Sequence, residues 1–163
     1  MDKQQTPLTN ILAYCFVLLL LANGYWFLNQ RPLSDNTDIL KATSEIFISA
    51  SEKVVDNDLV YLETYCIKGD LNNPDVQAII AVMDEVQSRK RNSGNIGAIT
   101  VGGAAIDMDV SFEYRVNSRY ISLVMTNERN VMFDMGTKSV VYTLQDGDLG
   151  KLFQAIKQYG TKL

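Results

Sequence analysis

The sequence predicts an α+β fold, in which an N-terminal transmembrane helix is followed by about three helices, a five-stranded antiparallel meander and a C-terminal helix packed on the sheet. Two patterns carry this prediction. Residues 8–28 include no charged side chain. Over residues 106–116, apolar and polar residues alternate without a break, which is typical of a strand with one buried face.

Residues 8–28 have the length of a membrane-spanning helix. At about 1.5 Å per residue they would extend ~31 Å, which matches the hydrocarbon core of a bilayer. An aromatic group at 25–27 stands where an interfacial belt is expected. The side chains that we expect to anchor the helix are Ile11, Phe16, Leu18, Leu20, Tyr25 and Trp26.

This stretch divides the chain into four parts. We expect a short tail at 1–7, a transmembrane signal anchor at 8–28, a linker at 29–38 and a soluble α+β domain at 39–163. The alternatives to an anchor are a signal peptide cleaved after residues 22–24 and a buried core helix. Basic residues are nearly balanced across the span. Because the tail is short, we expect the domain to be exported, which predicts an inner-membrane, single-pass protein with a periplasmic domain.

The first half of the domain reads as helical. Apolar residues recur at intervals of four over 42–54, which predicts an amphipathic helix from residue 39 onward. Residues 59–67 fit either a helix or a strand, and we favour the helix. Asn73 followed by Pro74 predicts a helix start, and Arg89 begins a basic run that would lie at the C-terminus of that helix.

The second half changes to a period of two. The expected strands cover residues 96–101, 106–116, 119–126, 131–135 and 140–144, joined by short turns such as Gly102-Gly103 and Asn117-Ser118. A final helix follows Asp148 and ends at Gly160. The meander and the flanking helices together predict a sheet with one face covered.

Composition excludes several kinds of chemistry. The 163 residues carry a formal charge of -4, which argues against nucleic acid as a partner. The chain has no histidine, so catalytic triads and zinc sites that need an imidazole are excluded. No cofactor is expected. The chain has two cysteines, of which only Cys66 lies outside the span, so an intradomain disulfide is not expected.

The one weak candidate for a metal or acid/base site is the pair Asp107 and Asp109. Alternate residues of a strand point the same way, so the two carboxylates would lie about 7 Å apart. The simpler interpretation is a solvated strand face whose acidic residues keep the sheet soluble. We therefore expect no catalytic residue and no enzyme.

The remaining functional signal is surface. Four residues on the face opposite the expected core are candidates for a partner surface: Tyr120, Val124, Met132 and Val141. Cover by the N-terminal helices is the explanation that we favour for their apolar character, and both hold if helices cover one face and a partner covers part of the other. The order of helices followed by an antiparallel sheet is similar to the periplasmic domains of secretion and conjugation subunits, an architectural resemblance that rests on no motif.

These observations predict a membrane-anchored protein-interaction module. It would bind the bilayer through residues 8–28 and dock other envelope or membrane proteins, as an assembly, scaffold or regulatory subunit of a secretion or conjugation complex. A homo-oligomer is compatible with this role. The alternatives are a phage- or plasmid-encoded envelope inhibitor or exclusion factor that binds a target protein, and an enzyme that uses Asp107 and Asp109.

Overall fold

The computed structural model describes residues 7–28, 30–57, 59–90, 108–126, 130–134 and 139–163. The chain divides into two compact units, residues 1–30 and residues 31–163. The first unit contains helix α1 (Pro7–Leu28). The second is an α+β domain, so the predicted fold class is confirmed at that level.

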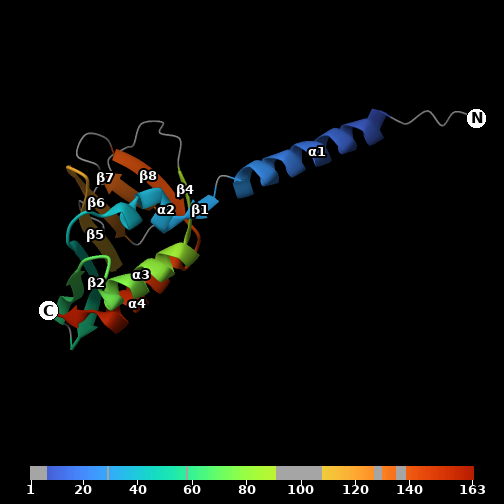
Figure 1. Cartoon of the computed structure of the whole chain (residues 1–163). Helices are drawn as coiled ribbons and strands as arrows, with labels where there is room; N and C mark the ends of the chain where they lie inside the picture. Colours follow the sequence, from blue (N-terminus) through green and yellow to red (C-terminus); the bar gives the residue numbers. More distant parts are fainter. Residues whose placement is uncertain (1–6, 29, 58, 91–107, 127–129, 135–138) are drawn as a thin grey trace, which may run out of the picture. The chain divides into compact units, whose positions relative to one another are not determined.

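The domain is built on one sheet, in which the neighbouring strands from β4 to β9 pair antiparallel (Figure 1). Within the described residues it has nine strands in the order β1-β4-β8-β7-β6-β5-β2-β3-β9. The strands are β1 (Gln30–Pro32), β2 (Ile46–Asp56), β3 (Leu59–Gly69), β4 (Gln87–Lys90), β5 (Met108–Val116), β6 (Arg119–Thr126), β7 (Asn130–Asp134), β8 (Ser139–Leu144) and β9 (Thr161–Lys162).

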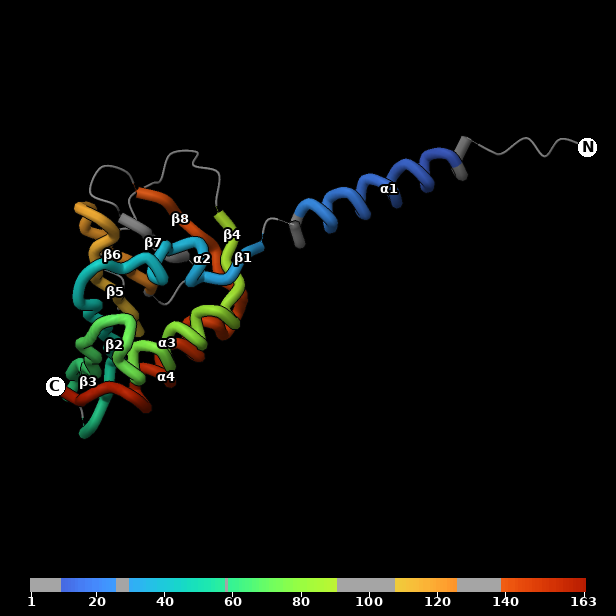
Figure 2. The backbone as a smooth tube through the Cα atoms, viewed as in Figure 1, coloured from blue at the N-terminus to red at the C-terminus, as the bar shows by residue number. Residues whose placement is uncertain are grey.

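Helices cover one face of this sheet. They are α2 (Leu33–Thr37), the short 3-10 helix η1 (Ile39–Lys41), α3 (Pro74–Glu85) and α4 (Asp148–Tyr159). Helices α3 and α4 lie side by side, and α4 contacts β2, β3 and β5 (Figures 1 and 2). Val110, Phe112 and Tyr114 of β5 point into the core beneath these helices. The predicted packing of the final helix on the sheet is confirmed.

Helix α2 is fastened to the same face by two tyrosines. The Tyr114 hydroxyl donates to the carbonyl oxygen of Thr37, and the Tyr142 hydroxyl donates to that of Asn36 at 3.3 Å. Burial raises the pKa of Tyr114 above its ordinary range. Because a buried hydroxyl without a partner is costly, these bonds fix where α2 lies.

Several expected elements differ in the structure. Residues 46–56 form strand β2, so the helix predicted there is wrong. Residues 59–69 form strand β3, so the helix that we favour for residues 59–67 is also wrong and the strand alternative is correct. The spacing that suggested a helix, four residues from Ile46 to Ala50, is also an even number, so it fits one face of a strand equally well. Ile48, which is fully buried between them, reveals the period of two.

Two further segments are also placed differently. Arg89 and Lys90, the first two residues of the basic run expected at the end of the third helix, lie in β4, because α3 ends at Glu85 and Val86 has extended backbone angles. Arg91 lies outside the described residues. The interval expected to be a linker contains β1 and α2, and Leu33 within it is fully buried. A segment of five residues is too short to show a periodic pattern.

Four of the five expected meander strands are confirmed as β5 to β8, and each pairs antiparallel with the next. The Asn117 turn between β5 and β6 is also present, with Asn117 at a φ of 55°. The remaining expected strand at 96–101 and the Gly102-Gly103 turn lie outside the described residues.

The start of α3 gives a direct test of this architecture. The Asn73 side-chain oxygen accepts hydrogen bonds from the backbone N–H groups of Asp75 at 2.8 Å and Val76 at 3.3 Å. We expect Asn73→Ala to lower the free energy of unfolding by about 1 kcal/mol, because an N-cap is lost. The measurement is urea unfolding of the full chain in detergent.

The matched control is Asn72→Ala, one residue earlier. Only the backbone N–H of Asn72 is bonded, to Asp70 at 2.8 Å, and the substitution keeps it. Equal loss of stability in the two variants would contradict the capping role of Asn73.

Candidate functional site

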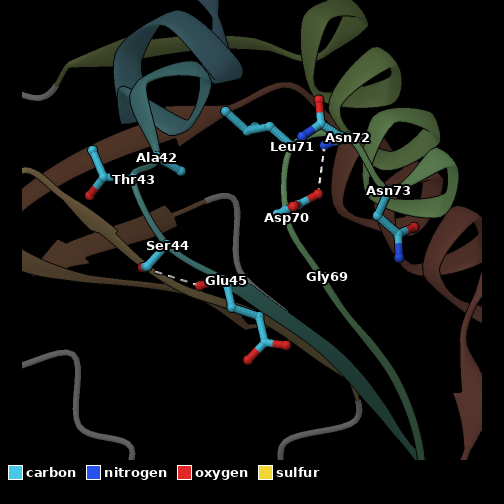
Figure 3. A pocket seen from close by; sticks show the side chains of 9 residues that line it. All are labelled: Ala42, Thr43, Ser44, Glu45, Gly69, Asp70, Leu71, Asn72 and Asn73. Atoms are coloured by element: carbon cyan, nitrogen blue, oxygen red, sulfur yellow. Dashed lines mark hydrogen bonds between the residues drawn. The ribbon is translucent and has the colours of Figure 1, made fainter.

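An open hollow of about 750 Å³ lies beside the start of β2 and the turn that leads into α3 (Figure 3). Its lining is polar and comes from residues 42–45 and 69–73. Its carboxylates are already engaged: Glu45 pairs with Lys68 at 3.3 Å, and Asp70 accepts the N–H of Asn72. Because these carboxylates already have partners within the domain, the polar lining of the hollow is explained without a ligand.

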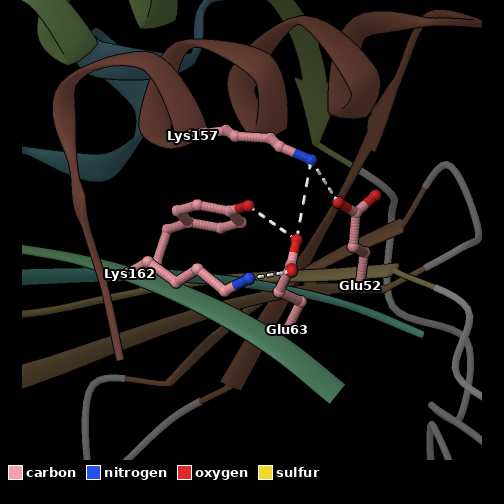
Figure 4. Close-up of polar contacts among 5 residues, drawn as sticks. Glu52, Glu63, Lys157 and Lys162 are labelled. Atoms are coloured by element: carbon pink, nitrogen blue, oxygen red, sulfur yellow. Dashed lines mark hydrogen bonds and ion pairs between the residues drawn. The ribbon is translucent and has the colours of Figure 1, made fainter. Parts of the chain in front are cut away.

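A more tightly bonded group joins α4 and β9 to the β2–β3 hairpin (Figure 4). We call it the Lys157 cluster, and its members are Glu52, Glu63, Tyr65, Lys157 and Lys162. The Lys157 ammonium lies 2.5 Å from a Glu52 oxygen and 3.8 Å from a Glu63 oxygen. Lys162 pairs with Glu63 from the other side, and the Tyr65 hydroxyl donates to Glu63 at 2.6 Å.

In the Lys157 cluster, the positive charges of the lysines lie next to the negative charges of the glutamates. Hydrogen bonds from Lys162 and Tyr65 hold the pKa of Glu63 below its ordinary value. The bond from Tyr65 to Glu63 raises the pKa of that tyrosine, and the bond to Glu52 raises the pKa of Lys157. Two carboxylates face two ammonium groups, so positive and negative charges are paired within the cluster. This arrangement favours fastening over acid/base chemistry.

The Lys157 cluster predicts a pH dependence of stability. Because the pKa of Glu63 is lowered in the fold, its stabilising effect is present above the ordinary pKa of a glutamate and is lost as the pH falls through the lower folded value. We expect the difference in unfolding free energy between the native chain and Glu63→Gln to be constant near neutral pH. It should shrink as the pH falls below the ordinary pKa of a glutamate, about 4.3.

Denaturant unfolding at a series of pH values measures this difference. Glu45→Gln, which removes a carboxylate from an exposed ion pair, controls for the loss of one charge. A difference for Glu63→Gln that does not change with pH would show that the ionised carboxylate adds nothing to stability.

The weak acidic candidate is only partly within the described structure. Asp107 lies outside the described residues. Asp109 lies on β5, opposite Ser51 on one side and Thr126 on the other. Burial raises the pKa of Asp109, and a hydrogen bond from Ser51 opposes that rise. Among the residues with described positions, no group of three or more acidic or cysteine side chains could hold a metal ion.

The four residues of the expected partner surface lie on the sheet face away from the helices, which we call the outer face. The register places Val124 opposite Met132, and Met132 opposite Val141. Tyr120 is exposed and Val124 is half-buried, whereas Val141 is only 7% exposed. The side chain of Met132 lies outside the described part. Further along the same row, Ser111 bonds to Ser49 at 2.8 Å.

A second apolar surface was not expected from the sequence. Residues 53–57 and 59–62 extend β2 and β3 past their pairing with other strands in the described structure, and we call them the β2–β3 arm. Among the described residues, pairing of β2 with β5 ends at Glu52, and β9 pairs with β3 at Tyr65 and Cys66. Val54 is half-buried, but five other apolar side chains of the arm are more than two-fifths exposed: Val55, Leu59, Val60, Tyr61 and Leu62. The apolar run at 59–62 could have indicated this surface. Because we interpreted the run as part of a helix, its position at the edge of a sheet was not predicted.

The expected anchor residues lie on α1. Ile11, Phe16, Leu18, Leu20 and Tyr25 are all more than half exposed, and the side chain of Trp26 lies outside the described part. A search of the described residues found no helix that combines the length and the apolar character needed to cross a membrane.

Comparison with known proteins supplies no relative. No protein-family model matches the chain, and no similar curated protein or solved structure was found.

Proposed function

We propose that the chain is a single-pass, membrane-anchored protein-interaction module. It would serve as an assembly, scaffold or regulatory subunit of a bacterial envelope complex of the secretion or conjugation type, with its α+β domain in the periplasm. The observation that carries the proposal is the surface of α1, where apolar side chains are exposed on every side of the helix.

The energetic argument concerns water. Within the described part of α1, ten large apolar or aromatic side chains are exposed. Burying such a side chain is favourable by about 1.5–3 kcal/mol, so covering all ten would contribute on the order of 20 kcal/mol. That exceeds the whole stability of an ordinary domain, about 5–15 kcal/mol. Lipid would supply this cover without needing a complementary protein surface.

The polar groups of α1 are compatible with lipid. The Asn23 side-chain amide donates to the Leu19 carbonyl oxygen at 2.8 Å, so it finds a partner within the helix itself. The backbone of a helix is bonded internally, which is the requirement for any segment in a bilayer.

The outer face supports the docking part of the proposal. It combines exposed Tyr120 and half-buried Val124 with hydroxyl side chains that already bond to one another across strands. Tyrosine is enriched in protein interfaces because one ring offers apolar contact and a hydroxyl together. A partner could bind here without leaving buried polar groups unpaired.

Site-specific photocrosslinking in living cells tests this function. A photoreactive residue at Tyr120 or Val124 should give discrete crosslinks to another envelope protein, identified by mass spectrometry of the joined peptides. The matched control is Leu40, which is about as exposed as Tyr120 but lies on η1. Equal crosslinking at all three positions, or none at the first two, would contradict docking through the outer face.

A further inference from the structure

The β2–β3 arm has an unprotected strand edge. Within the described residues, β3 pairs with β2 along its whole length, from Leu59 to Gly69 without a bulge. On its other side, the pairing found for β3 begins with Thr64, whose carbonyl accepts the N–H of Leu163. The backbone groups of residues 59–63 that point away from β2 are therefore open to another strand.

This edge lacks the devices that usually block such contacts. Soluble proteins protect edge strands with charged side chains, prolines, bulges or covering loops. Residues 59–62 are Leu, Val, Tyr and Leu, so they contain no charge and no proline. Glu63, the next residue, turns its carboxylate to Lys157 and Lys162, so its charge is compensated within the domain.

The polar tip of the arm makes a lipid bilayer an unfavourable cover for the arm. Asp56 is exposed at the end of β2 and Asn57 follows with a φ of 46°. Insertion of the tip into a bilayer would bury this carboxylate at a high energetic cost. A strand laid along the side of the arm leaves Asp56 and Asn57 in water.

We propose that the β3 edge over residues 59–62 pairs antiparallel with the same edge of a second copy of this chain. A two-fold axis perpendicular to the sheet keeps equivalent faces on the same side, so apolar residues meet apolar residues. The contact is isologous and closes on itself, which leaves neither edge open. An uncharged segment of this kind opposes itself without repulsion between like charges.

The size of the surface fits a modest dimer. Four exposed apolar side chains lie on the pairing strand itself, and at roughly 100 Å² each they offer at most about 400 Å² per copy. Two copies would bury at most about 800 Å², which is the size of a weak interface. If both copies are anchored in one membrane, as proposed above, their effective concentration rises and favours pairing. The pairing itself does not depend on that anchor.

Cysteine crosslinking of the purified full chain in detergent tests the pairing. In a background of Cys15→Ser and Cys66→Ala, single variants Val60→Cys, Tyr61→Cys and Leu62→Cys place a thiol at successive positions of the edge. One position should lie at the two-fold axis and form a disulfide at least tenfold faster than Leu40→Cys, a control at an exposed position outside the arm. The measured quantity is the initial rate of dimer formation under mild oxidation.

Light scattering gives the second measurement. The native chain should have the mass of a dimer, and Leu62→Lys should raise the dissociation constant at least tenfold, whereas Leu40→Lys should not. A monomeric native chain with control-level crosslinking would overturn the proposal. A dimer that Leu62→Lys leaves intact would place the contact elsewhere, which also overturns it.

Lipid or a different protein covering the arm would each give a result that differs from self-pairing. A bimane label at Leu62→Cys that is quenched by brominated lipid in single-copy nanodiscs would assign the arm to lipid and refute self-pairing. Crosslinks from position 62 to a different protein in cells, with a monomeric purified chain, would assign the arm to that protein. Each result is independent of crosslinking at Tyr120, so failure of the dimer and failure of outer-face docking remain distinguishable.

Discussion

Where a folded chain leaves a large apolar surface exposed, that surface favours binding to lipid or to another protein. One face of this sheet is covered by α2, α3 and α4, and the residues beneath them are almost fully buried. In the part of the chain that the structure describes, α1 between Ile11 and Tyr25 and the β2–β3 arm also expose apolar side chains. The proposed lipid anchor and the proposed self-pairing follow from this single constraint.

The outer face carries hydroxyl side chains beside its apolar ones. These hydroxyls bond to each other across strands, as those of Ser51 and Thr64 do at 3.1 Å. The Lys157 cluster then fastens α4 and β9 to the base of the β2–β3 arm. That fastening holds the hairpin where it leaves the sheet, so the exposed segment begins from a fixed base.

The sequence was most informative where a pattern had one explanation. The alternation over 106–116 could only be a half-buried strand, and Asn73-Pro74 combines a cap with a residue suited to the first helical turn, so β5 and α3 were predicted correctly. The β2–β3 hairpin was missed because a spacing of four suits helices and strands alike. In β3, residues 59–62 are all apolar and all exposed, so they show no alternation of apolar and polar residues. Only β2 pairs with this segment in the described structure, so neither of its faces is buried in the core.

The candidate surfaces were predictable only in part. Register follows from turn positions, so Tyr120 and Val124 could be assigned to one face from their spacing alone. The burial of Val141 depends on tertiary packing, and the Lys157 cluster joins residues about a hundred positions apart. No local pattern encodes such contacts.

The membrane anchor is the claim on which the functional account most depends, and the single tryptophan of the chain reports on it. The measurement is fluorescence of the full chain in bilayers whose lipids carry bromine at defined depths, with Leu18→Trp in a Trp26→Phe background for comparison. The account predicts that Trp26 is quenched most strongly by bromine near the headgroups and the tryptophan at position 18 by bromine near the bilayer centre. Emission typical of water at both positions, unquenched at every depth, would contradict it.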